Sequence, residues 1–414
     1  MIDFGRNNLD MASSPYLRQH ADNPVHWQEW SEKALVHART AGRLVLVSIG
    51  YATCHWCHVM AAEAFSDRDT ADFINQHYVA VKVDREQRPD IDGLFMDFVT
   101  RTTGSGGWPL NVVLSPEGNP FFGGTYFPRR SQSGLPSFLE VLRRVKSWHD
   151  ENGDRVVAYT LAHDDSPGTT VRDDAIALGL MGGFDEKDGG FGRGMKFPPH
   201  ATLLLLLHFG QATGSEAARD MVRITLDAMM NRGLHDHLQG GFFRYCVDRR
   251  WQIPHFEKML YDQAMHLWVY SLAVGVFGCD RYRRVVHKII RCLKETFATG
   301  DGLFVTAHDA DTDHLEGATY LWTPGEIRAV LGETAFKRFS ATYTLSEEGN
   351  FEGRNHLIKR PGRRTGASPH RVDAGIEESE NRLLEVRRKR SQPFVDGKII
   401  SGWNALAGIG LVMA

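Results

Sequence analysis

The chain has 414 residues, and at ~150 residues per domain this length predicts two or three domains, of which we expect two. Hydrophobic residues make up 42% and charged residues 24%, a globular composition that excludes a disordered or fibrous chain. The 48 basic and 51 acidic residues give a net charge of -3 and no general attraction to polyanions, so neither nucleic acid nor a membrane is expected as a partner.

The first residues lack the basic flank and apolar core of a secretory signal, and the most apolar run, Leu203 to Leu207, is too short to span a bilayer. Five cysteines are too few for a disulfide framework in a chain of this size, and their odd number favours reduced thiols. The sequence therefore predicts a soluble, cytoplasmic protein in which Cys246, Cys279 and Cys292 are buried apolar residues.

The first 160 or so residues alternate between strand and helix patterns. Continuous apolar runs predict buried strands, and apolar residues at helical spacing predict helices. The strands are expected at 44–49, 78–84, 110–114 and 120–124, and the helices at 34–40, 54–65, 69–77 and 137–148. A strand–helix–strand crossover followed by a hairpin predicts a thioredoxin-like α/β domain over residues 1–162.

Residues 163–172 hold polar and turn-forming residues without periodicity, so we expect a linker there. Beyond it the pattern is mostly helical and predicts an all-α domain over residues 173–414. Helices are expected at 201–212, 216–232, 256–277, 281–297, 376–390 and 402–414. The last of these stops in apolar residues without a cap or a polar tail, so we expect the helical domain to be incomplete.

The segment Cys54-His55-Trp56-Cys57-His58 carries the clearest chemical signal, and three interpretations compete for it. A c-type haem attachment site would require export and a different local context. Half of a zinc site would require a second ligand pair, and the other three cysteines are solitary. The third interpretation is a redox dithiol at the start of a helix that follows a buried strand. It needs no metal and no cofactor, and we expect neither.

In the dithiol interpretation Cys54 is the attacking thiol, because unpaired N–H groups and the positive end of the helix dipole lower the pKa of a thiol at a helix N-terminus. Cys57 lies one turn deeper and would resolve the mixed disulfide that Cys54 forms with a substrate. His55 either stabilises the thiolate further or is incidental. The expected chemistry is thiol–disulfide exchange.

Trp108-Pro109 follows a glycine turn and starts a strand, a setting that suits a cis peptide bond. In thioredoxin-like folds such a loop lies against the dithiol and presents backbone to the substrate. We therefore expect a cis bond, with Pro109 packed against the start of the Cys54 helix and Trp56 exposed beside it. The expected substrate-binding residues are His55, Trp56 and Trp108, beside the catalytic residues Cys54, Cys57 and Pro109.

Motifs along nearly the whole chain carry a family resemblance. In the first domain they include Ser14-Pro15-Tyr16-Leu17, Cys54-His55-Trp56-Cys57-His58, Val83-Asp84-Arg85-Glu86 and Gly106-Gly107-Trp108-Pro109, and in the second Gly189-Gly190-Phe191-Gly192, Pro254-His255-Phe256-Glu257-Lys258 and Ser401-Gly402-Trp403-Asn404. With these motifs the chain resembles the thioredoxin-domain family typified by spermatogenesis-associated protein twenty and its bacterial relatives. The resemblance implies that the helical domain is like the (α/α)6 toroid of six-hairpin glycosidases and N-acylglucosamine epimerases. Because the chain ends soon after Trp403-Asn404, this toroid is expected to be incomplete.

A second candidate site consists of polar residues that gather in loops and at helix starts of the helical part. They are His235, Asp236, His255, Glu257, Asp262, Asp309, Asp311 and Glu316. A pair of carboxylates among them could serve as acid and base on a carbohydrate, whereas the alternative is that they cap helices, at ~1 kcal/mol each. Asp309, Asp311 and Asp313 resemble the start of a calcium loop, but His314 and Tyr320 stand where glycine and glutamate are needed, so no calcium site is expected.

Three functions remain open from the sequence. The first is a thiol–disulfide oxidoreductase that acts on a protein or a small thiol. The second is a carbohydrate-binding or carbohydrate-modifying helical domain with a regulatory thioredoxin-like domain. The third is a non-catalytic module that holds a partner through a mixed disulfide.

Overall fold

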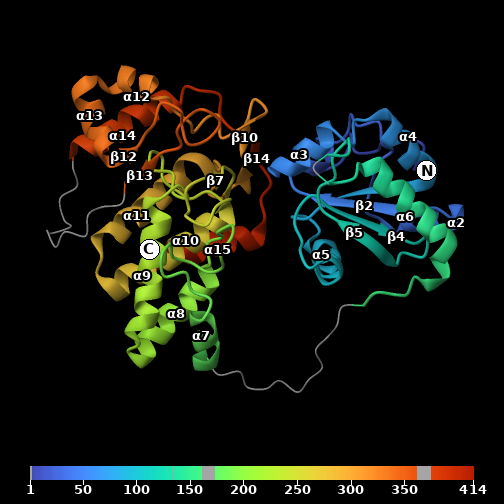
Figure 1. The fold of residues 1–414 in the computed structure, drawn as a ribbon, viewed down its shortest axis with the longest axis horizontal. Coiled ribbons are helices and arrows are strands. Elements are labelled where there is room, and N and C mark those ends of the chain that lie inside the picture. Colours follow the sequence, from blue (N-terminus) through green and yellow to red (C-terminus); the bar gives the residue numbers. More distant parts are fainter. Residues whose placement is uncertain (1, 133, 161–172, 361–373) are drawn as a thin grey trace. The chain divides into compact units, whose positions relative to one another are not determined.

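A computed structural model describes residues 2–132, 134–160, 173–360 and 374–414. The chain divides into two compact units, Met1–Asp165 and Ser166–Ala414 (Figure 1). The expected linker at residues 163–172 lies outside the described residues.

The first unit, blue to green in Figure 1, is built on a five-stranded sheet with the order β1-β3-β2-β4-β5. At its centre β2 (Leu44–Gly50) pairs in parallel with β3 (Tyr78–Asp84) and antiparallel with β4 (Leu110–Leu114). β5 (Pro120–Gly124) returns along β4, and the short β1 (Gln28–Glu29) lies parallel to β3. This strand order and these directions are those of a thioredoxin-like fold, as the sequence predicts.

Helices cover both faces of the sheet because its central strands are buried on both faces. The face that carries Val45, Val47 and Ile49 packs against α2 (Glu32–Ala41) and α5 (Pro89–Thr103). The opposite face is covered by α1 (Pro15–Arg18), α3 (His55–Ala62), α4 (Arg68–His77) and α6 (Phe138–Asn152). Successive strand residues point to opposite faces, so Ser48 and Gly50 lie beneath α1 and α3.

Most elements of this unit agree with the sequence prediction, and the strands at 78–84, 110–114 and 120–124 have the expected bounds. The expected helix at 54–65 is shorter, because α3 ends at Ala62. Helix α5 is not among the expected helices, although Ile91, Phe95, Phe98 and Val99 are buried at helical spacing after a proline at the first turn.

The second unit, green to red in Figure 1, is mainly helical. Its helices are α7 (Asp173–Met181), α8 (His200–Thr213), α9 (Glu216–Asn231), α10 (Leu260–Phe277), α11 (Asp280–Cys292), α12 (Pro324–Leu331), α13 (Glu333–Thr342), α14 (Ala374–Arg387) and α15 (Ser401–Met413). A π-helical turn, Leu293–Phe297, extends α11. Its strands have two residues each: β6 (Tyr245–Cys246), β7 (Pro254–His255), β8 (Lys258–Met259), β9 (Ala307–His308), β10 (Asp311–Thr312), β11 (Leu315–Glu316), β12 (Tyr343–Thr344), β13 (Ile358–Lys359) and β14 (Val395–Asp396).

The core of this unit lies around α10, which packs against α8, α11 and α15. A second cluster joins α12, α13 and α14 around Trp322, Phe339 and Leu383. The antiparallel hairpins α8–α9 and α10–α11 and the α10–α15 contact give an array like that of an (α/α)6 toroid. The expected fold class, a thioredoxin-like domain followed by a toroid-like helical domain, is confirmed.

Two further sequence expectations concern cysteines and membranes. Cys246 and Cys292 are buried as expected, but Cys279 is partly exposed because it precedes the first turn of α11. Within the four described ranges, every helix is too short or too polar to cross a bilayer.

Candidate functional site

The dithiol lies at the point where β2 gives way to α3. Cys54 is the N-cap residue of α3, and its Sγ accepts a hydrogen bond from the backbone N–H of Cys57 at 3.3 Å. The two cysteines form a disulfide, with their Cα atoms 5.2 Å apart. Both are buried, at 4% and 1% exposure. The first-turn N–H groups of α3 therefore face the sulfur of Cys54, as the dithiol interpretation requires.

The Trp108–Pro109 peptide bond is cis, as expected from the sequence. The next residue, Leu110, lies opposite Ile49 in the β2–β4 ladder, which brings Pro109 to the level of Gly50. The Trp108 indole donates a hydrogen bond to Asp92 at 2.7 Å, and the Arg85 guanidinium lies 3.9 Å from its ring centroid. The Trp108–Pro109 loop thus lies at the C-terminal end of β2, the end that is followed by the turn with the dithiol.

Trp56 is the exposed aromatic residue of this region, at 48% exposure. Its ring lies 5.0 Å from that of Tyr126, whose hydroxyl donates to Glu63 at 2.9 Å. His55 packs edge-on against Trp56, with ring centroids 5.4 Å apart. An aromatic surface therefore flanks the dithiol, and it includes His55 and Trp56, which the sequence assigns to substrate binding.

A buried polar group lies beneath the dithiol, and sequence reasoning missed it. A Cβ added at Gly50 would collide with both the hydroxyl of Tyr16 and Sγ of Cys57, so these two groups approach each other across the glycine. The Tyr16 hydroxyl has no hydrogen-bond partner among the described residues. Nearby, Nζ of Lys82 donates to Ser48 Oγ at 3.0 Å.

Lys82 is 1% exposed and forms no ion pair within the part of the chain that the structure describes. Instead its Nζ lies 4.2 Å from the ring centroid of Phe65, 4.7 Å from that of Trp27 and 5.4 Å from that of Tyr16. Burial lowers the pKa of Lys82 well below its ordinary value, and burial, aided by the charge of Asp84, raises the pKa of Tyr16. The uncharged forms of both groups are therefore favoured beneath the disulfide.

Several residues of the second candidate site come together around Arg244. Its guanidinium lies 3.4 Å from Glu257 and 3.1 Å from Asp262. His255 Nδ1 lies 2.7 Å from Glu316, and its Nε2 lies 3.8 Å from Glu257. Burial raises the pKa of Asp262 to about 6, although Arg244 opposes this shift. These residues form one buried cluster of acids, a histidine and an arginine, which we call the Arg244 cluster.

Asp236 lies apart from the Arg244 cluster. It is buried between two cations, with Lys258 Nζ at 2.7 Å and Arg387 at 2.8 Å, and it accepts from the N–H groups of Leu238 and Gln239. This is the geometry of a structural ion pair whose carboxylate also accepts hydrogen bonds from the backbone N–H groups of a turn. His235 lies in a separate pocket on the α11 side of the domain.

The segment around Asp309 and Asp311 forms a hairpin. β10 pairs with β11, and the two turn residues, Asp313 and His314, adopt the left-handed conformation with φ of 54° and 64°. Asp309 accepts the N–H of Asp311 at 3.2 Å.

Comparison with known proteins agrees with this geometry. Residues 6–163 match the family model Thioredox_DsbH, described as "Protein of unknown function, DUF255". Spermatogenesis-associated protein 20 of Rattus norvegicus is 35% identical over 458 residues, which cover 99% of this chain and 58% of the rat protein. The human protein of that name is 34% identical, over 97% of this chain and 57% of its own length. The first domain matches this family model, and the whole chain is similar to spermatogenesis-associated protein 20.

The chain spans about six-tenths of the length of these curated relatives, including an uncharacterized protein of Caenorhabditis elegans that is 34% identical over 100% of this chain and 63% of its own length. Among solved structures, a "DsbH Oxidoreductase" is 20% identical over 30% of this chain and 83% of its own, with a TM-score of 0.23. A sugar epimerase from a ruminal bacterium is 13% identical over 39% of this chain and 46% of its own, with a TM-score of 0.28. Scores this low bear on neither fold nor function.

The family motifs held a signal for the missed residues. Tyr16 belongs to the Ser14-Pro15-Tyr16-Leu17 motif, and Lys82 precedes Val83-Asp84. A lysine in the middle of the otherwise apolar strand β3 is itself unusual, because lysine is almost never fully buried. Its position in a buried strand could have marked it as part of the site.

Proposed function

We propose that the thioredoxin-like domain carries out thiol–disulfide exchange through Cys54 and Cys57. The observation that carries this proposal is the disulfide between the N-cap residue of α3 and the residue one turn deeper. In the reduced protein the N-cap position favours the thiolate of Cys54, since the free N–H groups of the first turn and the helix dipole stabilise its negative charge.

The exchange proceeds in two balanced steps. The Cys54 thiolate attacks one sulfur of a substrate disulfide, so that a bond forms from Cys54 Sγ to that sulfur and the other substrate sulfur leaves as a thiolate, which takes up a proton. Cys57 then loses its proton and attacks Cys54 Sγ, which releases the second substrate thiolate and closes the Cys54–Cys57 disulfide. The substrate gains two electrons and the dithiol loses two, and the reverse sequence oxidises a substrate dithiol.

Tyr16 is a positioning residue in this scheme. Its hydroxyl approaches Cys57 across Gly50 and stays protonated, because its pKa is raised. It can therefore donate a hydrogen bond to the sulfur of Cys57 once the disulfide opens. Trp56 and the Trp108–Pro109 backbone offer the surface against which a protein substrate would lie, since Trp56 is exposed and the loop reaches the same end of β2.

The test uses the full chain and insulin as the substrate. We expect the wild type to reduce insulin in the presence of dithiothreitol, and Cys57→Ser to accumulate a mixed disulfide between Cys54 and insulin, because the resolving thiol is missing. Cys279→Ser, which changes a partly exposed cysteine of the helical domain, is the matched control and should behave as the wild type.

Alkylation across pH provides the second readout, with Cys54 expected to titrate clearly below the ~8.5 of a free thiol. If Cys54 titrates as a free thiol and insulin reduction is absent, the proposal is wrong. If Cys57→Ser traps partner proteins while the wild type shows no turnover, the domain is instead a non-catalytic binding module.

A second function is favoured by one observation in the helical domain: an aromatic platform adjoins the Arg244 cluster. Phe197 is 50% exposed and stacks on Tyr245 at 4.4 Å, and Tyr245 lies 5.2 Å from His255. Aromatic faces beside paired carboxylates suit a sugar ring and acid–base chemistry on it. We propose carbohydrate binding there.

Thermal shift with cellobiose and N-acetylglucosamine at millimolar concentration tests this second proposal. We expect stabilisation of the wild type that is lost in Phe197→Ala and kept in Trp148→Ala, a comparably exposed aromatic residue of the other unit. An unchanged melting temperature with both sugars would contradict it.

A further inference from the structure

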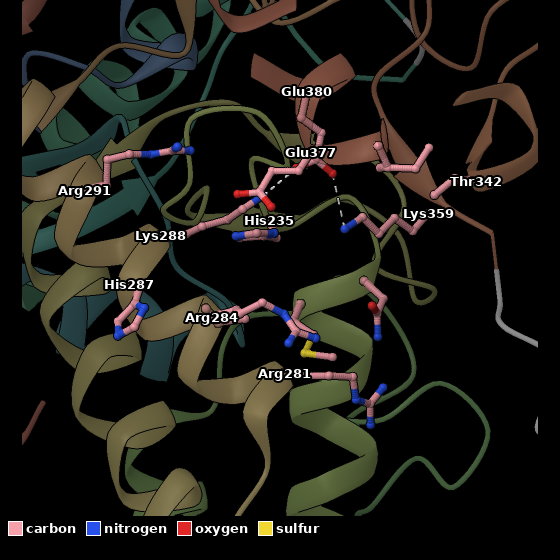
Figure 2. A pocket seen from close by; sticks show the side chains of 14 residues that line it. His235, Arg281, Arg284, His287, Lys288, Arg291, Thr342, Lys359, Glu377 and Glu380 are labelled. Carbon is pink, nitrogen blue, oxygen red and sulfur yellow. Dashed lines mark hydrogen bonds and ion pairs between the residues drawn. The ribbon is translucent and has the colours of Figure 1, made fainter. Parts of the chain in front are cut away.

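A pocket of about 490 Å³ lies in the helical domain, between the end of α9, one side of α11, β13 and the start of α14 (Figure 2). It contains neither the dithiol nor the residues of the Arg244 cluster. Its volume falls within the ~300 to 1,000 Å³ of small-molecule sites. Apolar atoms of Met230, Val285 and Ile376 form part of its wall.

The pocket is strongly basic, although the whole chain carries a net charge of only -3. Residues 281, 284, 288 and 291 of α11 are spaced by three, four and three, so one side of this helix presents three arginines and a lysine. Lys359 of β13 faces them from the other side, as Figure 2 shows. Against these five cations the lining holds two carboxylates, those of Glu377 and Glu380.

Ion pairs within the fold account for only part of this charge. The buried carboxylate of Glu380 lies 2.8 Å from Lys288 and 3.5 Å from Lys359, and Asp227 lies 3.3 Å from Arg281. Arg284 forms no ion pair or hydrogen bond with any residue that the structure describes. The half-buried Arg284 therefore adds a positive charge that no described residue neutralises.

Arg291 is held by backbone rather than by an acid. Its guanidinium donates to the carbonyl oxygens of Leu238 at 2.7 Å and Gln239 at 3.0 Å, so its charge is fixed in place but not neutralised. Burial is the main cause that lowers the pKa of Lys359, and the positive charges of Lys288 and Arg284 lower it further. This repulsion is consistent with an excess of positive charge in the pocket.

A histidine contributes a hydrogen-bond acceptor. His237 Nε2 lies 3.0 Å from the Arg232 carbonyl and must donate to it, which leaves His237 Nδ1 as an acceptor. His235 Nδ1, 3.3 Å away, then carries the proton, so Nε2 of His235 is unprotonated. This Nε2 has no partner among the described residues, and His235 is 3% exposed. Its ring lies between Lys288 and Lys359 (Figure 2).

We propose that this pocket binds a small phosphorylated sugar, with its phosphate at Arg284 and the neighbouring cations of α11 and β13, and a hydroxyl group donating to His235 Nε2. Arginine favours phosphate because its planar fork matches two phosphate oxygens. The unprotonated imidazole selects a ligand that also carries a hydroxyl donor, and the apolar wall excludes water around the ligand. The site is independent of the thiol–disulfide exchange proposed above.

Isothermal titration of the full chain at fixed ionic strength tests the proposal, with ribose 5-phosphate, glucose 6-phosphate and fructose 1,6-bisphosphate as probes. We expect saturable binding of at least one of them, at least tenfold tighter than that of inorganic phosphate, and none of glucose. Arg284→Ala should weaken binding at least tenfold without lowering the melting temperature, because Arg284 has no partner to lose among the residues that the structure describes.

The matched control is Arg283→Ala, on the same helix, which removes an exposed arginine that pairs with Asp280 outside the pocket. It should bind as the wild type does. His235→Gln should lose the preference for the sugar phosphate over inorganic phosphate. Absence of saturable binding with all three esters, equal weakening by both arginine variants, or binding of an RNA oligonucleotide alone would each overturn the proposal.

Discussion

Gly50 is the position where the geometry beneath the dithiol is most sensitive to a single methyl group. Its φ is not in the left-handed region, so Gly50→Ala is compatible with the backbone and adds only a Cβ. That Cβ would lie 2.6 Å from Cys57 Sγ and 2.8 Å from Tyr16 Cζ, and closer still to the Tyr16 hydroxyl. Every one of these contacts is shorter than van der Waals distance allows.

The backbone at Gly50 has little freedom to relieve these contacts. Gly50 lies opposite Asp84 in the parallel ladder, and its carbonyl accepts the N–H of Arg85 at 2.9 Å. Overpacking of a fixed core costs ~1 to 3 kcal/mol, and we expect the upper part of that range, about 2 to 3 kcal/mol. At about 1.4 kcal/mol per factor of ten, this lowers local protection from exchange by roughly 30- to 150-fold.

Native-state hydrogen exchange of the β2 and β3 amides, in the oxidised full chain, measures this loss directly. The control is Gly93→Ala in α5, where a Cβ meets nothing within 4 Å and a helical glycine is replaced, so stability should rise by ~0.5 to 1 kcal/mol. Tyr16→Phe in the Gly50→Ala background removes the nearest clashing atom and should restore part of the protection.

Protection in Gly50→Ala that stays within threefold of the wild type would refute the placement of Tyr16 and Cys57 around Gly50. The role proposed for Tyr16 in the exchange reaction would then fail with it, because that role depends on the same approach.

Two further predictions concern buried charges. Asp236→Asn should destabilise the helical domain by ~3 to 5 kcal/mol in thermal unfolding, because it leaves Lys258 and Arg387 buried without their carboxylate. The control Asp313→Asn, at an exposed turn, should leave the melting temperature unchanged. Equal melting temperatures for both variants would contradict the ion-pair role. For Lys82, the folded pKa lies below the unfolded value, so between the two the unfolded chain binds more protons and wild-type stability rises with pH. Lys82→Met should therefore have a higher free energy of unfolding than the wild type at pH 7, and the difference should shrink toward pH 10. A difference that instead grows with pH in unfolding experiments would show that Lys82 stays charged in the folded protein.

Local sequence patterns predict much of the thioredoxin-like domain. The strand at 78–84 is apolar apart from Lys82 and Asp84, and its expected bounds agree with those of β3. The Cys54–Cys57 motif and the Trp108-Pro109 pair each carry their own short-range signal, so the dithiol and the cis bond were predictable. By contrast, α5 was not predicted from the sequence. Its apolar residues recur at helical spacing, but Gly93 and several polar residues interrupt this pattern.

What the sequence by itself determined is thus the order of the elements, the dithiol and the family, since each depends on residues close together in the chain. The tertiary structure decided which distant groups meet. Tyr16 reaches Cys57 only through the packing of α1 on the sheet, and Arg387 reaches Asp236 across 151 positions of sequence. No local propensity encodes such contacts, because they arise when buried polar groups find partners as the core closes. For the same reason Asp236, for which the sequence leaves open a role in acid–base chemistry or in helix capping, is held by Lys258 and Arg387 in the fold.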